Sequence, residues 1–450
     1  MTVDTEQLLQ ELRRALAADA GSDQLRELLA GLHPVDLTEA LRALDLEERC
    51  RALEAVDPSF AAYALSGLEY ADQLATIRSL PRPLAAQILA AMSSDDMADM
   101  LAEAEPEVVN EILALIPEEA AEVRTLMQYP ERSAGGLMTP DYIAVPAEHT
   151  VEQTLEHLRT LKPDSETAYY VYVTDAAGTL VGVVSLRQLV IAHPQTKVGE
   201  LPYGDVIYVF ADTHQEEVAR LFEKYDFLAL PVVDHDRRLL GVVTVDDVID
   251  VIHEETTEDI TRLGGVEPLD EMYLSARPFQ LVRKRLGWLL ILFLAQSVTG
   301  NILGAFQETL ATATVLAIFI PLLIGTGGNA GTQASTLVVR ALAMGEVRYA
   351  DVFKVIGREA LVGALLGAAM AAVAFIWSQI FVTGFEVGIT VGLTVFAIVV
   401  VASSVGALLP ILARRLGFDP AVASAPLVAT VTDASGLILY FLIAKRVLGL

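Results

Sequence analysis

Hydrophobic residues follow two different patterns in the two parts of the chain. Up to residue 275 they recur at the short intervals that are typical of amphipathic helices and of strands. After the basic run at residues 283–285, five apolar stretches each reach the roughly 20 residues that a helix needs to cross a bilayer. We predict spans at residues 286–306, 313–339, 355–382, 387–413 and 422–444. The pattern therefore predicts a soluble part followed by a helical membrane domain.

Prolines at nearly constant intervals mark a helical repeat in residues 24–130. Pro34, Pro58, the Pro81/Pro83 pair and Pro106 each open a unit in which apolar residues follow at helical spacing. Proline is favoured in the first turn of a helix because the N–H that it lacks has no partner there. Pairs of short helices that stack on their neighbours predict an α-solenoid.

A strand–turn–strand pattern then occurs twice. Asp175 and Gly182 of the first copy correspond to Asp234 and Gly241 of the second copy, with the same offset of 59 residues. Each copy is preceded by a helix with a capping-box start, at Thr150 and at Thr213. The repeat predicts two related α/β units.

Charge is distributed as unevenly as hydrophobicity. The chain has 450 residues and a formal net charge of −28. Residues 1–274 hold 19 Lys and Arg against 52 Asp and Glu, whereas residues 275–450 hold 12 against 7. A soluble part with this excess of acidic residues repels phosphate groups, so nucleic acid is excluded as a partner. Divalent cations are its natural counter-ions. The single cysteine, Cys50, excludes a disulfide framework and fits a reducing compartment.

Basic residues predict the orientation of the spans. Lys and Arg precede the first span and lie between the second and third and between the fourth and fifth, but residues 307–312 and 383–386 contain none. This distribution predicts a cytosolic N-terminus and a C-terminus outside, although Lys445 and Arg446 contravene the rule. The first residues also lack the apolar core of a signal peptide, so we expect the soluble part in the cytoplasm.

One carboxylate, Asp433, lies inside the last apolar stretch. A charge at membrane depth costs roughly 2.5–3.5 kcal/mol on insertion scales, so such a group is normally functional. No Lys, Arg or His lies between Arg415 and Lys445, and small polar residues surround Asp433. We therefore predict that Asp433 lines a cation path.

The second span is unusually rich in glycines and amides from Gly325 to Gln333. The glycines fit two interpretations equally well, a close helix–helix contact or a backbone that lines a wet cavity. Asn329 and Gln333 lie at helical spacing on one face, which favours a pore lining for these amides.

Acidic residues are densest at residues 246–259, just before the membrane domain. Asp247, Asp250 and Glu258 fall on one helical face, where like charges repel one another. Mg²⁺ commonly binds to one or two carboxylates and retains several waters. Each of these acids alone is explained by a helix face that is exposed to water, and the same holds for Asp95, Asp96 and Asp99. For the acids of residues 246–259 taken together, we favour a divalent-cation sensor.

The two α/β units resemble a pair of CBS domains, a tandem module that commonly senses adenine nucleotides or ions. The resemblance rests on the order of the elements, their spacing and the Gly-Val-Val-Ser and Gly-Val-Val-Thr turns. The first copy has Gln188 where the pattern places an acid, and no functional prediction rests on ATP binding. The nucleotide contacts that the resemblance implies are Tyr170, Ser185, Arg187, Phe227, Thr244 and Asp247.

The whole chain resembles the MgtE family of Mg²⁺ channels. Residues 134–140, residues 325–329 and residues 426–430 with Asp433 match the family's characteristic segments. The resemblance implies a multidomain fold with a cytosolic α-solenoid, tandem CBS (α/β) domains and an all-α polytopic membrane domain of five transmembrane helices. We assign residues 1–130 to the N-terminal solenoid, 137–200 and 201–252 to CBS domains 1 and 2, 253–282 to a connecting plug helix and 283–450 to the membrane domain.

The resemblance also implies roles for single residues. A homodimer would enclose one pore, in which Asp433 of each subunit holds a hydrated Mg²⁺ and the carbonyl of Ala429 faces the same ion. Cytoplasmic Mg²⁺ would bridge the soluble domains and the plug helix and close the pore. Acids that match this sensor role are Asp95, Asp99, Glu216, Asp226, Asp247, Asp250, Glu255, Glu258, Asp259 and Asp419. Tyr63, His214 and Thr332 depart from the family pattern.

We therefore predict a homodimeric, Mg²⁺-selective channel of the cytoplasmic membrane that imports Mg²⁺ and is closed by several bound Mg²⁺ ions per subunit. The alternative is a secondary transporter that couples H⁺ or Na⁺ to Mg²⁺, Mn²⁺ or Co²⁺. The spans lack the His and acid clusters or serine–base pair that catalysis needs, so we predict no enzyme activity. A nucleotide sensor without transport would leave Asp433 unexplained.

Overall fold

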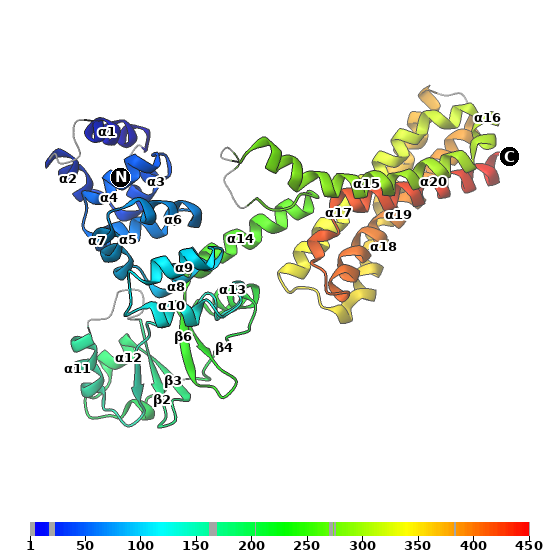
Figure 1. Cartoon of the computed structure of the whole chain (residues 1–450). Coiled ribbons are helices and arrows are strands. Elements are labelled where there is room, and N and C mark those ends of the chain that lie inside the picture. The colour runs from blue at the N-terminus through cyan, green and yellow to red at the C-terminus, as the bar shows by residue number, and fades with distance from the viewer. Residues whose placement is uncertain are drawn as a thin grey trace. The chain divides into compact units, whose positions relative to one another are not determined.

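The computed structural model describes residues 5–17, 23–161, 169–202, 204–269, 273, 276–381 and 384–449. The chain consists of two compact units, Met1–His253 and Glu254–Leu450 (Figure 1). The first unit contains a helical repeat and two small α/β domains, and the second contains five long apolar helices. The predicted fold class is therefore confirmed.

Short helices that stack in two rows form the N-terminal repeat. In one row α3 packs on α5 and α5 on α7, and in the other α4 packs on α6, α6 on α8 and α8 on α10. This alternation is that of an α-solenoid. The helices are α1 Thr5–Ala17, α2 Asp23–Ala30, α3 Pro34–Arg42, α4 Leu46–Glu54, α5 Pro58–Ser66, α6 Tyr70–Ser79, α7 Arg82–Ala90, α8 Ser94–Ala102, α9 Pro106–Leu113 and α10 Ala120–Leu126.

The proline positions predicted the helix starts correctly. Pro34, Pro58 and Pro106 are the first residues of α3, α5 and α9, and Pro83 is the second residue of α7. His33 and Asp57, just before two of these prolines, accept a hydrogen bond from a backbone N–H of the first turn. The first N–H groups of a helix have no partner within the helix. Proline removes one of these donors and the cap residue accepts a hydrogen bond from another, so together they fix the helix start.

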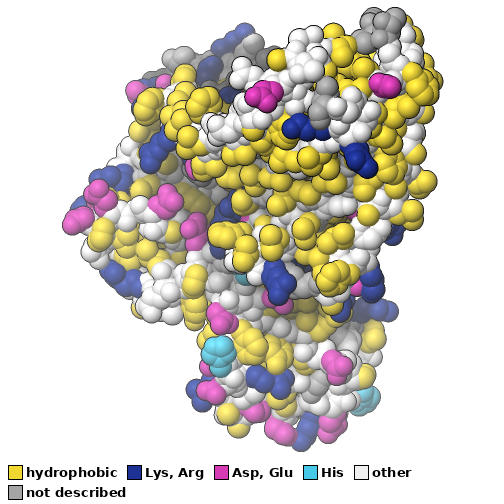
Figure 2. All heavy atoms as spheres, turned by 90° about the vertical axis from the view of Figure 1, so that its right-hand side faces the viewer, with side chains coloured by type: hydrophobic (Ala, Val, Ile, Leu, Met, Phe, Trp, Pro, Cys, Tyr) yellow, Lys and Arg dark blue, Asp and Glu magenta, His cyan; other side chains and the backbone are white. Residues whose placement is uncertain are grey.

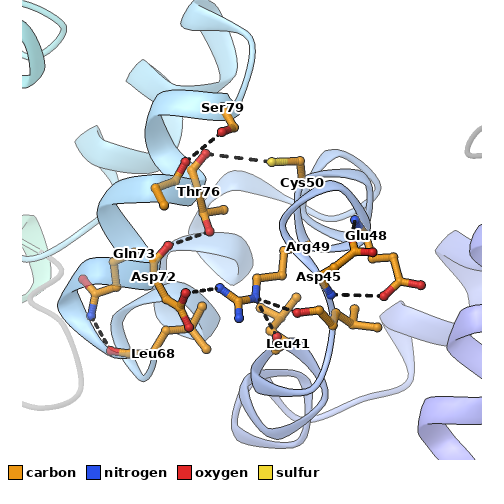
Figure 3. A network of polar contacts seen from close by, with 12 residues as sticks. Leu41, Asp45, Glu48, Arg49, Cys50, Leu68, Asp72, Gln73, Thr76 and Ser79 are labelled. Carbon is orange, nitrogen blue, oxygen red and sulfur yellow. Dashed lines mark hydrogen bonds and ion pairs between the residues drawn. The ribbon is translucent and has the colours of Figure 1, made fainter. Parts of the chain in front are cut away.

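A buried arginine, Arg49 of α4, connects two neighbouring repeats (Figure 3). Its Nε donates to the carbonyl oxygens of Leu41 at 2.8 Å and of Leu44 at 3.1 Å, at the end of α3. Its Nη1 lies 2.7 Å from Oδ1 of Asp72 on α6. Carbonyl groups at a helix C-terminus lack intrahelical partners, so Arg49 satisfies them and ties α3, α4 and α6 together.

The two α/β domains have the same strand order and register. β1 is parallel to β2, and β2 is antiparallel to β3; β4, β5 and β6 repeat this arrangement. Tyr170 is paired with Ser185 in the first sheet as Ala229 is paired with Thr244 in the second. The elements are β1 Ala144–Pro146, α11 Val151–Leu161, β2 Tyr170–Thr174, β3 Leu180–Ser185, α12 Leu186–Ile191, η1 Val198–Glu200, β4 Val209–Phe210, α13 Gln215–Tyr225, β5 Ala229–Val233, β6 Leu239–Thr244 and α14 Val245–Leu263.

The segment at residues 134–140 packs against the second sheet. Thr139 and Val242 exchange backbone hydrogen bonds of 2.8 and 2.9 Å. Gly241 permits this approach, because a Cβ at that position would lie 2.7 Å from the carbonyl oxygen of Thr139. The segment thereby sets the position of Asp141, which follows it.

The second unit is built from long helices with apolar outer faces. α19 packs against α17, α18 and α20, α17 also packs against α20, and α15 packs mainly against α20. Figure 2 shows hydrophobic side chains over most of the helical face turned to the viewer. The elements are α15 Pro278–Ala305, α16 Gln307–Thr312, η2 Thr314–Phe319, α17 Ile320–Ala343, η3 Tyr349–Asp351, α18 Val352–Phe381, α19 Phe385–Arg415, η4 Pro420–Val422 and α20 Ala425–Leu448.

Five described helices are long and apolar enough to cross a membrane, as predicted. Most of their ends lie within a few residues of the predicted spans, and two starts are notable. α15 begins at Pro278 rather than at residue 286, because proline supports a helix start outside the apolar stretch. The second span begins as the 3₁₀ segment η2 and becomes α-helical only at Ile320. Hydrophobicity indicates which residues lie in the membrane, not where the helix begins.

We expect Arg49→Met to destabilise the solenoid locally, because it leaves the carbonyls of Leu41 and Leu44 and the carboxylate of Asp72 without their donor. The loss should be about 2–3 kcal/mol. Hydrogen exchange of the α3 and α6 amides, followed by mass spectrometry of the whole protein, should accelerate by about 30- to 100-fold.

The control is Arg51→Met on the same helix, which removes an exposed ion pair with Glu47. Exposed pairs contribute less than about 1 kcal/mol, so exchange should change little. Equal effects of both substitutions would contradict the bridging role of Arg49.

Candidate functional site

Several carboxylates of the first unit lie close together. Asp95 and Asp99 come from α8, and Asp247 comes from the first turn of α14. Thr244 donates a hydrogen bond to Oδ2 of Asp247 at 2.6 Å, and Tyr70 donates to Oδ2 of Asp99 at 3.4 Å. Oδ1 of Asp95 is buried and has no hydrogen-bond partner. The fold therefore brings together three of the predicted sensor residues.

Negative charge is costly in this group, which we call the α8–α14 acidic cluster. Burial, with repulsion from Asp96 as the next cause, raises the pKa of Asp95 to about 6. Burial and repulsion from Asp95 raise the pKa of Asp99 to about 7. The pKa of Asp247 is raised well above its usual range, first by burial and then by Asp95. A cation would relieve both effects.

The sequence-based list of sensor residues missed four members of the cluster. Asp96 and Asp246 adjoin predicted residues, and burial followed by repulsion from Asp246 raises the pKa of Asp96. Asp141 acts electrostatically on Asp95, and Glu131 acts on Asp99. The acidic runs contain Asp96 and Asp246, but no local signal identifies Asp141 or Glu131. Asp141 follows the segment at residues 134–140, and Glu131 follows α10, which packs on α8.

The cluster does not form a site of direct metal ligands. Among the described residues, no three His, Cys, Asp or Glu side chains lie close enough together to hold one metal ion directly. Mg²⁺ binds through one or two carboxylates and keeps several of its waters. The orphaned oxygen of Asp95 and the shared charge of its neighbours fit such a hydrated ion.

The other predicted sensor acids of the first unit lie elsewhere. Glu216 is in the first turn of α13 and pairs with Arg220. Asp226 caps the opposite end of the same helix in the left-handed conformation, with φ of 54°. At 1.5 Å per residue, the two are about 15 Å apart along the helix, so they do not form one site. Asp250 is exposed on α14.

Glu255, Glu258 and Asp259 lie on the part of α14 that belongs to the second unit. Glu258 is only 5% exposed and forms an ion pair with Arg262. Arg262 also forms an ion pair with Asp419, in the segment before α20. Two predicted sensor acids are thus brought together, and Arg262, which the sequence analysis missed, lies between them.

Asp433 lies on α20 where three helices meet. Its side chain is buried, its Oδ1 has no hydrogen-bond partner, and the side-chain amide of Gln296 on α15 lies near the carboxylate. A Cβ at Gly328 of α17 would lie 3.8 Å from Oδ1 of Asp433 and 3.5 Å from Cβ of Ala429. The fold therefore joins the two predicted motifs around Asp433. Gln296 was missed because a glutamine in a long apolar stretch carries no positional signal.

The carbonyl of Ala429 has a partner of its own. The hydroxyl of Thr432 donates to this oxygen at 2.9 Å. A carbonyl oxygen has two lone pairs, so an ion at Ala429 would compete with Thr432 and with the helical hydrogen bond.

The close-packing interpretation holds for two of the second-span glycines. A Cβ at Gly327 would lie 2.7 Å from Ile398, and one at Gly331 would lie 2.9 Å from Val428, so these glycines serve close packing. A Cβ at Gly325 would meet no atom of a neighbouring element within 4 Å. Asn329 and Gln333, four residues apart, are exposed on that outer side.

The predicted nucleotide residues belong to equivalent positions of the two α/β domains. The hydroxyl of Thr244 donates a hydrogen bond to Asp247, and the hydroxyl of Ser185 donates one in the same way to Oε1 of Gln188 at 2.8 Å. Gln188 also closes a capping box at the start of α12, which explains how it replaces the acid without loss of structure. Phe227 stacks on Tyr225, with ring centroids 5.4 Å apart, while Tyr170 is half-buried and Arg187 exposed.

Comparisons with known protein families account for most of the chain. A model of the MgtE divalent cation transporters matches residues 320–443, one of the MgtE intracellular N domain matches residues 32–132, and CBS domain models match residues 134–194 and 198–254.

Curated relatives match over similar lengths. The chain is 43% identical to the magnesium transporter MgtE of Thermus thermophilus, over 98% of this chain and 99% of the relative. It is 32% identical to the magnesium transporter MgtE of Bacillus subtilis, over 95% of each protein.

Two crystal structures resemble the soluble part. One is the cytosolic domain of the Mg²⁺ channel MgtE in complex with ATP, with 44% identity, a TM-score of 0.51 and coverage of 54% of this chain and 99% of that one. The other is the soluble part of a magnesium transporter, with 33% identity, the same TM-score and coverage of 56% and 99%.

We expect the α8–α14 acidic cluster to make the first unit less stable as the pH rises. The pKa values of Asp95 and Asp99 in the folded protein, about 6 and 7, exceed the ordinary value of 3.8, so the folded state binds more protons than the unfolded state between these limits. Hydrogen exchange of the α8 amides, corrected for intrinsic rates in metal-free buffer, should therefore be less protected at pH 8 than at pH 5. Added Mg²⁺ should restore protection at pH 8 and do little at pH 5.

The double variant Asp95→Asn/Asp99→Asn is the control. It should lose less α8 protection between pH 5 and pH 8 than the wild type does, because only Asp96 and Asp247 still titrate in the cluster, and it should respond less to Mg²⁺. A wild-type protein whose α8 protection does not change with pH would contradict the assigned electrostatics.

Proposed function

The chain belongs to the MgtE family of magnesium transporters, and from this premise we propose that it is an integral membrane channel that conducts Mg²⁺. The observation that carries the proposal is Asp433, a buried carboxylate with an unpartnered oxygen at the junction of α15, α17 and α20. In an apolar helical unit, such a charge is expected only on an ion path or beside a partner. The relatives are named as transporters, and the chain is no enzyme.

Asp433 would select a hydrated divalent cation by charge. The side-chain amide of Gln296 lies near the carboxylate, and Oδ1 of Asp433, which has no hydrogen-bond partner, is available to the water shell of the ion. Gly328 leaves the space beside that oxygen open, because a side chain there would contact Ala429 and approach Asp433. Mg²⁺ gives up its waters reluctantly, so a site that binds the hydrated ion permits rapid passage.

A homodimer would complete the path. Asn329 and Gln333 are exposed on a helix that is long and apolar enough to cross a membrane, where amides are unfavourable unless water or protein covers them. In the first unit, Val190 and Ile249 occupy equivalent positions of the two α/β domains and are 67% and 49% exposed. Both surfaces are suited to contact with a second copy.

The acidic soluble domains would act as the sensor. Mg²⁺ ions bound at the α8–α14 acidic cluster would favour the arrangement that holds its carboxylates together, and the closed pore would be linked to it. A ligand shifts such an equilibrium only by its differential affinity for the two states, and the raised pKa values of Asp95, Asp99 and Asp247 mark where that affinity arises. Several ions per subunit would make the response steep.

The membrane orientation and the ATP site are part of the same proposal. The N-terminal unit would lie in the cytoplasm, as the basic residues predict, with the C-terminus outside. A relative's cytosolic domain was crystallised with ATP, and Thr244 with Asp247 would be the corresponding contacts here.

A carrier that couples H⁺ or Na⁺ to the divalent cation is the alternative. Asp433 would then be protonated and deprotonated in each cycle. Single-channel currents in a planar bilayer distinguish the two, because a carrier turns over too slowly to give resolved current steps.

We expect Asp433→Asn to lower Mg²⁺ flux into proteoliposomes by at least about tenfold, because the charge that attracts the ion is lost. The protein should still insert and elute as the wild type does. Asp351→Asn, which removes an exposed ion pair with Lys354 in the same unit, should leave flux nearly unchanged. Normal Mg²⁺ flux through Asp433→Asn would refute the pore assignment.

We expect the triple variant Asp95→Asn/Asp99→Asn/Asp247→Asn to conduct Mg²⁺ but to remain open when Mg²⁺ on the cytoplasmic side is raised. Patch-clamp recording from inside-out patches measures this directly. The control replaces Glu103, Glu107 and Glu118, three exposed acids of the solenoid, with glutamine. Because both variants lose three charges, an equal effect would indicate a general charge effect and not a sensor.

A further inference from the structure

The end of α14 is fastened to the membrane unit by an arginine between two acids. Arg262, in the last turn of the helix, forms ion pairs with Glu258 one turn earlier and with Asp419. The side chains of Glu258, Asp419 and Arg262 are 6%, 26% and 34% exposed. Partly buried ion pairs are screened less by salt than exposed ones, so this three-residue group is more than a surface contact.

Asp419 connects Arg262 to the helix that carries Asp433. Its Oδ1 accepts the backbone N–H of Ala421 at 2.8 Å and so starts η4, directly before α20. The carbonyl of Ala423 accepts a hydrogen bond from Ser335 of α17 at 3.1 Å. The pull of Arg262 on Asp419 therefore acts on the segment that sets the start of α20.

The residues that follow Arg262 also dock onto the membrane unit. Gly265 has φ of +70°, and a Cβ there would lie 2.4 Å from the indole of Trp288 on α15 and 3.5 Å from Pro426 on α20. The N–H of Glu267 donates to the carbonyl of Lys284 at 3.2 Å. Only glycine accepts both this backbone conformation and this proximity. We call residues 262–267 the docking segment.

Glu258 and Asp419 are also two of the acids assigned to the Mg²⁺ sensor. A guanidinium and a divalent cation cannot both occupy the space between the same two carboxylates. We propose that Arg262 is a positioning residue, an internal cation that holds Glu258 and Asp419 together when no divalent cation does so and thereby keeps the docking segment on α15 and α20. This inference rests on the proposed function for the identity of the competing ion, Mg²⁺.

The proposal assigns the two cations the same structural task. With Arg262 present, the docking segment stays in place in metal-free protein. Without Arg262, the two carboxylates lose the cation that joins them, their mutual repulsion opens the contact, and Mg²⁺ bound between them closes it again. Lysine at this position retains the charge but not the two-sided geometry of guanidinium, so it should be intermediate.

Trp288 reports on the docking segment directly. The chain has two tryptophans, so Trp377→Phe leaves Trp288 as the single emitter. In full-length protein in detergent, Arg262→Gln should shift the emission of Trp288 to longer wavelength and accelerate its quenching by acrylamide in metal-free buffer. Addition of Mg²⁺ should return both values to those of the Arg262 protein.

Three further variants distinguish the effect of Arg262 on the docking segment from misfolding, from a change in the pore and from a general charge effect. Asp419→Asn should give the same red shift, but Mg²⁺ should not reverse it because one of the two carboxylates is missing. Asp433→Asn should leave Trp288 unchanged even though it blocks flux, so the failure of one proposal is distinguishable from the failure of the other. Lys354→Gln, at an exposed ion pair in the same unit, is the charge control and should also leave Trp288 unchanged.

The proposal is overturned if Trp288 in metal-free Arg262→Gln and Asp419→Asn emits and is quenched as in the Arg262 protein. A red shift in Arg262→Gln that Mg²⁺ does not reverse would overturn the competition between Arg262 and the ion.

Discussion

Buried carboxylates without a fixed positive partner are the constraint on which the rest of this protein depends. Desolvation favours a proton or a cation beside such a group. In the soluble unit this constraint acts on Asp95, Asp99 and Asp247, whose pKa values are raised chiefly by burial. In the membrane unit it acts on Asp433, whose free oxygen lies beside a glycine. Each place is an incomplete site that a mobile cation can complete.

The same chain supplies its own cation where a permanent connection is needed. Arg49 satisfies two carbonyls and Asp72, and this arrangement holds the solenoid repeats in register. Arg262 holds Glu258 and Asp419 at the membrane end of α14. A contact made by a guanidinium of the chain is present whatever the cation concentration. A contact between carboxylates that needs a cation from solution depends on the concentration of that cation.

Small residues allow the helices of the membrane unit to pack closely around Asp433. Gly327 and Gly331 bring α17 against α19 and α20, and a Cβ at Gly406 would lie only 2.2 Å from the carbonyl of Gly331. Such close approach between helices is typical of membrane proteins, in which packing replaces the hydrophobic effect. It also leaves Gly328 beside Asp433 and Asn329 exposed, so one helix serves packing and also carries the residues of the proposed ion path.

The sequence by itself determined the helical repeat, the paired α/β units and the five apolar helices, because periodicity and proline spacing are local signals. It also identified Asp433 as the candidate pore residue, because a charge in an apolar stretch is a local signal too. Tertiary structure alone decided which acids meet. Asp141 and Glu131, which come from the chain after α10, act on acids of α8. Gln296 of α15 lies near Asp433 of α20, and Arg262 lies between acids 161 positions apart in sequence. Glu216 and Asp226, close in sequence, are separated by the length of a helix. Electrostatic partnership depends on distance in space, and local sequence patterns carry no information about contacts between distant segments.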